Sequence, residues 1–246
     1  MYNTLEHQIH MARQMVTDHS RIVCLLGVGM RIESGIPNPE GNDIVYYMEE
    51  EYGYAPEEIF AASYFYTRPG SFYKAYKDVY LGRDYEPSAA YYRLADLEKQ
   101  GKLSGCVTQA EYSLAKKAGV WNVVELHGSI YENWCPKCKR RYTKEYLRDQ
   151  KGTPLCEECK MTIRPGIVLR GEQVRNDYIT NAANMISNAD MMMVLGTNMN
   201  DGLVVWAMNY FRGNCVLEIS KNSHFSDNRA SLAINAPVVE VLPQIT

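Results

Sequence analysis

Short apolar runs recur along the chain, and several of them end in glycine or polar residues. The first run, residues 21–26 (RIVCLL), is rich in β-branched and leucine side chains, and glycine follows it. A continuous apolar run of this length is typical of a strand that is buried on both faces of a parallel sheet. The other runs that we interpret as strands are residues 104–108, 123–126, 191–195, 215–219 and 238–242.

Helical periodicity separates several of these runs. Near the N-terminus, apolar residues three or four apart begin with Leu5 and end with Val16, which predicts an amphipathic helix. Asn3 and Glu6 have the spacing of a capping box at its start. The other segments that we predict as helices here are residues 87–100 and 178–187. Strands that alternate with helices indicate an α/β fold with a doubly wound parallel sheet.

Two segments break this alternation. Residues 42–85 are rich in tyrosine and helical in pattern, whereas residues 131–164 hold two CxxC pairs and little apolar periodicity. We interpret both as insertions that together form a smaller domain. The larger part then comprises residues 1–41, 86–130 and 165–246, and the whole chain forms one unit.

The two CxxC pairs have the spacing of a metal site. Cys135 and Cys138 are separated from Cys156 and Cys159 by 17 residues. Each CxxC turn brings two thiolates together, and two such turns complete the tetrahedron that zinc prefers. Four cysteines leave no open coordination position, so we predict one structural zinc ion per chain. A disulfide or free thiols are the alternatives.

Composition narrows the class of protein. The chain has 246 residues, of which 46% are hydrophobic and 22% charged, with a net charge of −3, as expected of a globular protein with a sizeable core. The acidic balance makes nucleic acid an unlikely partner, and we interpret the basic residues near the cysteines as a solvated face. We see neither a signal peptide nor an apolar stretch that would span a membrane, and seven cysteines suggest the reducing cytoplasm. The basic residues in question are Lys137, Lys139, Arg140, Arg141 and Lys144.

A glycine-rich segment follows the first predicted strand. Gly27 and Gly29 lie where a strand turns into a helix, and glycines at such a turn let the backbone approach a pyrophosphate. This GxG alone is weak evidence for a dinucleotide-binding site, because Ile32 stands where the dinucleotide-binding fingerprint has its third glycine.

Further motifs make the assignment more specific. They are ESGIP at residues 33–37, TQ at 108–109, ELHG at 125–128, the two CxxC pairs, RPGIVLRGE at 164–172 and LGTN at 195–198. In this order, and from residue 27 to about residue 220, the chain resembles the sirtuin family. The resemblance implies a large Rossmann-like domain and a small domain built from a helical insertion and a zinc module. It also implies that NAD and an acyl-lysine meet in the cleft between the two domains.

The resemblance further implies a reaction and a set of site residues. In the family, nicotinamide leaves as the acyl oxygen attacks the ribose, a histidine acts as general base on a ribose hydroxyl, and the acyl group ends on ADP-ribose. His127 matches that histidine; from position alone it could instead merely cap a strand. The implied cofactor-binding residues are Gly27, Val28, Gly29, Glu33, Ser34, Gly35, Ile36, Pro37, Gln109, Gly196, Thr197, Asn198, Ser220 and Lys221.

Several positions depart from the family pattern where its chemistry takes place. The usual TQNID reads TQAEY at residues 108–112, so Ala110 and Tyr112 replace the asparagine and aspartate that position the ribose and hold the nicotinamide amide. Arg170 stands where the family has the phenylalanine of FGE. Losing positioned polar contacts of this kind typically costs orders of magnitude in rate. The remaining replacements are Val28, Arg31, Asn38, Pro39 and Glu40 in the glycine-rich segment, and Asn198, Asn200, Asp201 and Ser220 further on.

Two functions therefore compete. The first is an NAD-dependent deacylase with an acylated protein or peptide as substrate, weak on acetyl-lysine or altered in acyl specificity. The second is a protein that binds NAD or an ADP-ribose-like ligand as a sensor without turnover. We favour the enzyme, because a sensor has no evident need for His127.

Overall fold

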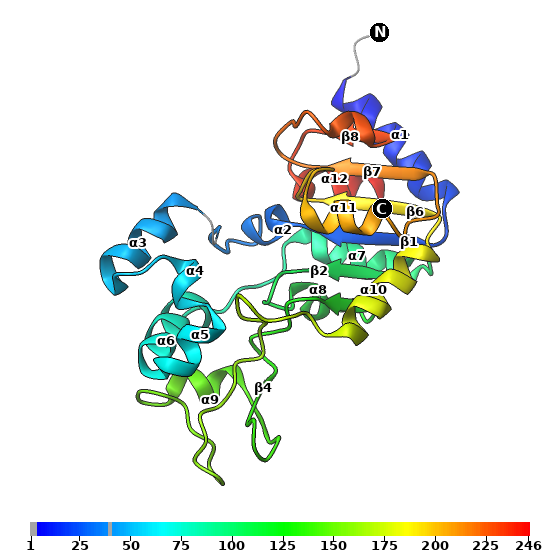
Figure 1. The fold of residues 1–246 in the computed structure, drawn as a ribbon. Helices are drawn as coiled ribbons and strands as arrows, with labels where there is room; N and C mark the ends of the chain where they lie inside the picture. The colour runs from blue at the N-terminus through cyan, green and yellow to red at the C-terminus, as the bar shows by residue number, and fades with distance from the viewer. Residues whose placement is uncertain (1–3, 39–40) are drawn as a thin grey trace.

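The computed structural model describes residues 4–38 and 41–246 and centres on a six-stranded parallel sheet (Figure 1). Its strands lie in the order β3-β2-β1-β6-β7-β8, so the chain reverses direction across the sheet between β1 and β6. That reversal is the point at which doubly wound sheets bind ligands, at the carboxyl ends of the strands. The strands are β1 (Ile22–Leu26), β2 (Leu103–Thr108), β3 (Val123–Glu125), β6 (Met191–Leu195), β7 (Cys215–Ile219) and β8 (Leu232–Ile234).

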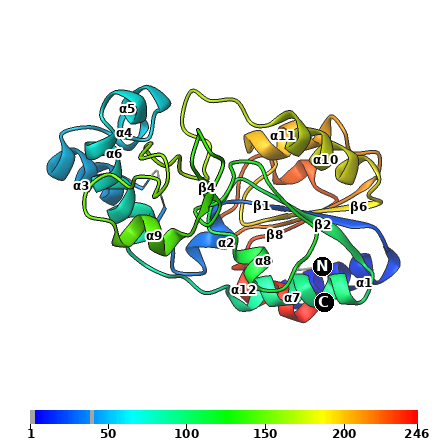
Figure 2. The same cartoon turned by 90° about the horizontal axis from the view of Figure 1, so that it is seen from below.

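Helices cover both faces of the sheet (Figure 2). On one face lie α10 (Asn176–Ser187) and α11 (Gly202–Met208), and on the other lie α1 (Leu5–Asp18), α7 (Ala89–Lys99), α8 (Leu114–Lys117) and α12 (Val238–Ile245). Strand β1 is buried throughout; Cys24 packs into the core on the α1 side, whereas Val23 and Leu25 pack into the core on the α10 side. The continuous apolar run reflects this double burial.

The C-terminal segment differs from its prediction. Residues 238–242 form the start of helix α12 and not a strand, and β8 occupies the edge position of the sheet instead. Val238, Val241, Leu242 and Ile245 are buried at helical spacing, which a run of five apolar-rich residues is too short to distinguish from a strand.

The start of α1 also differs in detail. Thr4 is the residue before α1, and its side chain accepts a hydrogen bond from the backbone N–H of His7. The predicted capping residue Asn3 lies outside the described residues, as do Pro39 and Glu40.

The two inserted segments lie together at one end of the molecule, away from most of the sheet (Figure 1). Lys144, only 1% exposed, donates from Nζ to the carbonyl of Arg83 and to the carboxylate of Asp84, both at 2.6 Å. A buried ammonium with two such partners ties the segments to each other. Their elements are α3 (Asn42–Tyr52), α4 (Pro56–Ile59), α5 (Ala62–Thr67), α6 (Pro69–Tyr76) and the π-helix η1 (Lys77–Leu81), then β4 (Asn133–Trp134), β5 (Arg141–Tyr142) and α9 (Lys144–Asp149).

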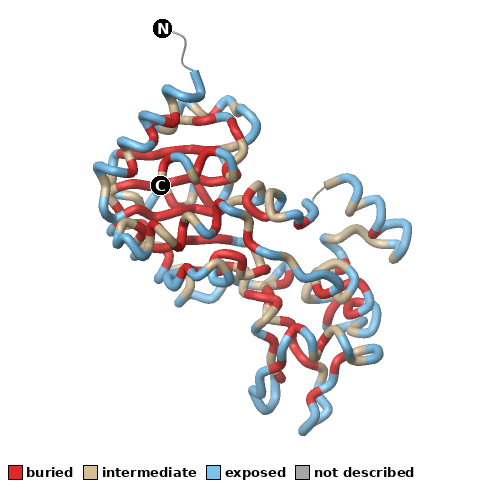
Figure 3. Tube along the Cα trace, turned by 180° about the vertical axis from the view of Figure 1, so that it is seen from behind, coloured by how far each residue is buried: buried red, intermediate tan, exposed pale blue. Residues whose placement is uncertain are grey.

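The buried residues concentrate in the sheet and its flanking helices, whereas the outer loops of the insertions are largely exposed (Figure 3). Two short elements complete the chain, α2 (Val28–Ile32) and the 3-10 helix η2 (Asp227–Arg229). Among the described residues, no helix is both long and apolar enough to cross a membrane.

Candidate active site

Two glycine-containing loops meet at the carboxyl ends of β1 and β6. The N–H of Gly29 donates to the carbonyl of Gly196 at 2.8 Å. A Cβ on Gly27 would lie 2.3 Å from the Cβ of Thr197, and a Cβ on Gly196 would lie 2.5 Å from the backbone nitrogen of Met30. Gly196 also has a φ of +71°, a conformation that favours glycine. These glycines therefore let the two loops pack backbone to backbone at the switch point of the sheet.

Beside these loops lies a cavity of about 330 Å³, here called the glycine-loop cavity. Of the predicted site residues, it brings together Gly27, Val28, Gln109 and His127, which follow three neighbouring strands. The other residues that line the cavity had been named only as replacements in the family pattern, or had not been named at all. The full lining is Leu26, Gly27, Val28, Arg31, Asn38, Gln109, Ala110, Glu111, His127, Asp201 and Leu203.

His127 follows β3 and lines two cavities at once. Its carbonyl accepts a hydrogen bond from the N–H of Val168 at 2.8 Å, which fixes the backbone beside the segment that carries Arg170. Burial lowers the pKa of His127 below its ordinary value, because burial disfavours the charged imidazolium. The ring is therefore neutral near pH 7 and can accept a proton.

The second cavity, here called the Arg170 cavity, has a volume of about 370 Å³. One wall is the segment of residues 167–172, and the other contains Phe60 and Tyr80 from the helical insertion. The N–H of Arg170 donates to the carbonyl of Phe60 at 3.0 Å, so the two walls are joined through their backbones. The Arg170 guanidinium lies 3.8 Å from the carboxylate of Glu57 and is largely exposed, which makes this wall partly charged.

Several predicted cofactor residues have other partners. The carboxylate of Glu33 accepts hydrogen bonds from the N–H groups of Val238 and Val239, at 2.9 and 2.8 Å, at the start of α12. The hydroxyl of Ser34 accepts from the N–H of Ser88 at 3.1 Å. The predicted residues that do not line the glycine-loop cavity are Gly29, Glu33, Ser34, Gly35, Ile36, Pro37, Gly196, Thr197, Asn198, Ser220 and Lys221.

A largely buried ion pair lines the glycine-loop cavity. Arg31 is 7% exposed, and its guanidinium lies 3.4 Å from the carboxylate of Glu111 and 5.5 Å from the ring centroid of Tyr112. Burial raises the pKa of Glu111, and the neighbouring Arg31 charge opposes that rise. Tyr112 in turn stacks on Tyr80, with ring centroids 6.0 Å apart. Sequence reasoning named Arg31 and Tyr112 as separate replacements and missed the contact between Arg31 and Glu111. The sequence did offer a signal for it, because a cation and an anion stand in two motifs that belong to the same site.

The four cysteines of the CxxC pairs form one cluster. Their sulfur atoms all lie within 4.8 Å of one another, with Cys135 Sγ 3.2 Å from Cys159 Sγ and Cys138 Sγ 3.5 Å from Cys156 Sγ. The hydroxyl of Tyr142 donates to Cys156 Sγ at 3.1 Å, as an outer partner of a metal ligand does. Four converging thiols with no further donor form the ligand set of a structural zinc site, as predicted.

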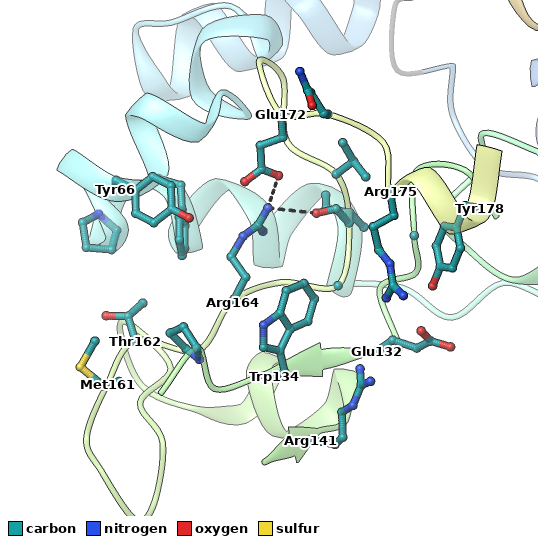
Figure 4. A pocket seen from close by; sticks show the side chains of 18 residues that line it. Tyr66, Glu132, Trp134, Arg141, Met161, Thr162, Arg164, Glu172, Arg175 and Tyr178 are labelled. Carbon is teal, nitrogen blue, oxygen red and sulfur yellow. Dashed lines mark hydrogen bonds and ion pairs between the residues drawn. The ribbon is translucent and has the colours of Figure 1, made fainter. Parts of the chain in front are cut away.

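A larger cavity of about 670 Å³, here called the Trp134 cavity, lies where both insertions meet the segment that precedes α10 (Figure 4). None of the predicted site residues lines it. Arg164 projects into its centre, forms an ion pair with Glu172, and lies 5.8 Å from the ring centroid of Trp134. Arg164 also donates to the carbonyl of Ile167 at 3.3 Å, so it braces the wall that this cavity shares with the Arg170 cavity.

Comparisons with known proteins agree with this architecture. The model of the Sir2 family matches residues 27–201. The NAD-dependent protein deacetylase of Clostridium acetobutylicum is 33% identical over 97% of this chain and 98% of its own length. A protein of the same name from Clostridium perfringens is 31% identical over 98% of this chain and 99% of its own length.

Solved structures give the same result. A structure described as the structural basis of sirtuin substrate affinity superposes with a TM-score of 0.85, at 29% identity over 95% of this chain and 96% of that one. Sir2 bound to an acetylated peptide superposes with a TM-score of 0.78, at 27% identity over 96% of both chains. The family model, the related sequences and the superposed folds thus agree, and the chain belongs to the Sir2, or sirtuin, family.

Proposed function

We propose that the protein is an NAD-dependent deacylase that acts on acylated lysines of proteins or peptides. The observation that carries this proposal is the position of His127, which lines both the glycine-loop cavity and the Arg170 cavity. A nucleotide in the first cavity and an acyl-lysine in the second would meet at this imidazole. The relatives named NAD-dependent protein deacetylase support the proposal.

The chain's own residues suit specific steps. NAD, when bound, supplies the ribose that accepts the acyl group. His127 is neutral near pH 7 because burial lowers its pKa, and a neutral imidazole can take a proton from a ribose hydroxyl. Gly27 and Val28 hold the nucleotide side, and the paired walls of the Arg170 cavity shield the acyl side from water.

We further propose that acetyl-lysine is a poor substrate. The methyl group of Ala110 offers no hydrogen bond to the ribose or the leaving group. Tyr112 is 3% exposed and packs between Tyr80 and Tyr85, so its side chain does not replace the missing aspartate. The charged Arg170 wall favours an acyl group that carries a carboxylate over a plain acetyl group.

The alternative is a protein that binds NAD or ADP-ribose without turnover. The Arg31–Glu111 pair favours it, because this pair lines the same cavity as Ala110 and places two charges there that the family pattern lacks. Such a sensor would need the nucleotide side of the cleft but not His127.

The test compares nicotinamide release from NAD with acetyl-, succinyl- and long-acyl-lysine peptides. We expect turnover with at least one longer or carboxylate-bearing acyl group and little with acetyl. His127→Ala should abolish acyl transfer to ADP-ribose and leave ADP-ribose binding within about threefold. His224→Ala is the matched control, because His224 lies near η2, hydrogen-bonds to Ser226 and lines neither cavity. Absence of release with every peptide, together with tight ADP-ribose binding, would support the sensor instead.

A further inference from the structure

We infer that Arg31 makes the glycine-loop cavity a receptor for a carboxylate, so that the cleft prefers a dinucleotide carrying nicotinic acid to one carrying nicotinamide. The inference rests on the proposed function only in placing a dinucleotide in this cleft. It concerns which ring substituent the chain recognises, and not whether acyl transfer occurs.

The guanidinium of Arg31 is buried but not fully paired. Nη1 lies 3.4 Å from the Glu111 carboxylate, and Nη2 donates to the carbonyl of Pro37 at 3.3 Å. Nε is buried and has no hydrogen-bond partner in the described part of the chain. A guanidinium carries five N–H donors, so among the described residues these two long hydrogen bonds use only part of its capacity. Burial of an unpaired donor is costly, and a ligand that supplies acceptors removes that cost.

The location of this group selects the part of a dinucleotide that would meet it. Arg31 lines the glycine-loop cavity together with Ala110, and it also lines an adjoining cavity of about 290 Å³ together with Tyr112. By the family resemblance, the positions of Ala110 and Tyr112 are those that position the ribose and hold the nicotinamide amide. The structure thus places the Arg31 cation beside Ala110 and Tyr112, the two positions where the family's asparagine and aspartate have been replaced.

The hydrogen-bonding character of the site has changed accordingly. A carboxamide presents one acceptor and one NH₂ donor group, and the family's aspartate is an acceptor for such donors. Arg31 has donors only, so a carboxamide can satisfy it with its oxygen but turns its NH₂ group toward like donors. A carboxylate has two acceptor oxygens, and it can form two parallel hydrogen bonds with the planar fork of an arginine.

A carboxylate ligand would compete with the Glu111 carboxylate for the Arg31 guanidinium. Its carboxylate holds one edge of the guanidinium at 3.4 Å, which is longer than a close charge-assisted hydrogen bond. Burial also raises the pKa of Glu111, so its charged form is held at a cost. Tyr80, Tyr85 and Tyr112 line the adjoining cavity on the other side of Arg31, so the surroundings of the guanidinium there are aromatic.

Isothermal titration calorimetry with NAD, its nicotinic acid counterpart and ADP-ribose tests the inference. We expect the wild-type protein to bind the acid form at least about tenfold more tightly than NAD. ADP-ribose lacks the ring and reports the shared part of the ligand. Arg31→Met should bring the ratio of acid to amide affinity to about one and leave ADP-ribose within about threefold, whereas Arg31→Lys should retain only part of the ratio. Arg212→Met is the control, because Arg212 is exposed beyond the end of α11.

Equal affinity of the wild type for the two dinucleotides would overturn the inference. So would a ratio that Arg31→Met leaves unchanged. If Arg31→Met does not fold, the wild-type ratio and Arg31→Lys still decide. A succinyl-lysine peptide supplies the other possible source of a carboxylate; if Arg31→Met weakens that peptide and not the acid dinucleotide, the inference is wrong. Binding of both dinucleotides without acyl transfer would refute the proposed function alone, and binding of none would refute both.

Discussion

Replacement of Glu33 should destabilise the fold and leave nucleotide binding intact, although this position belongs to the ESGIP motif. The Glu33 carboxylate accepts hydrogen bonds at 2.9 and 2.8 Å from the N–H groups of Val238 and Val239. These are two of the N–H groups that a helix start leaves without an intrahelical partner. Pro237, the residue before the helix, has no side-chain acceptor, so Glu33 performs that task from a distant part of the chain.

The magnitude follows from these two bonds. A side-chain cap contributes about 1 kcal/mol, and a hydrogen bond to a charged group about 1.5–3 kcal/mol. Because Glu33 is only half-buried, we expect Glu33→Ala to lower the free energy of unfolding by about 2–3 kcal/mol. For a chain of this size, 1 kcal/mol corresponds to about 2–4 °C in Tm, so the Tm should fall by about 4–12 °C.

Thermal unfolding with and without ADP-ribose measures both parts of this prediction. Glu33→Ala should shift Tm downward, and the added stabilisation by ADP-ribose should match that of the wild type. Glu50→Ala is the control, because Glu50 is exposed in the last turn of α3. The reasoning fails if Tm moves by less than about 1 °C, or if the folded variant loses ADP-ribose binding.

Three further predictions address the metal, the glycine loops and a buried acid. Metal analysis should find one zinc per chain, and Cys138→Ser should lose it together with several degrees of Tm, because a closed thiolate site contributes folding energy. Gly196→Ala should abolish the stabilisation by NAD, since its Cβ would meet Met30, whereas Gly202→Ala, whose Cβ would meet nothing within 4 Å, should not. Burial raises the pKa of Glu218 from 4.5 to about 7, so protonation favours the folded state and wild-type stability should fall between pH 5 and 8; thermal unfolding of Glu218→Gln should show a smaller fall.

Much of the sheet could be predicted from sequence, because its strands are buried on both faces. The runs that became β1 and β6 are continuously apolar, short and followed by glycine, a pattern that favours a buried strand. Strand β8 was missed, since Leu232–Ile234 is only three residues long and carries no periodicity of its own. Residues 238–242 were predicted as a strand because so short an apolar run does not distinguish a strand from a buried helix. Without a helix at that point, the hydrogen bonds from Glu33 to the start of α12 could not be predicted.

The candidate site was predictable only where it depends on local chain geometry. His127 lies two residues after β3, and the carboxyl ends of parallel strands share one edge of the sheet, so its place at the cleft follows from its position. The contact between Arg31 and Glu111 joins residues 80 positions apart, and no local pattern specifies such a pair. Sequence reasoning identified Arg31 as a replacement and left Glu111 without comment, and only the packing of α2 against the loop after β2 brings them together.

That contact changes how the replaced positions should be understood. An arginine placed alone at a 7% exposed site would be an uncompensated buried charge, which costs several kcal/mol. Glu111 supplies the opposite charge at 3.4 Å, and the Tyr112 ring adds a cation–π contact at 5.5 Å. The replacements in two separate motifs therefore depend on one another. Reverting Arg31 alone to the serine typical of the family would leave Glu111 buried without its partner and Tyr112 where a small acid stood. These positions should therefore be exchanged as a set when their effect on nicotinamide release is measured.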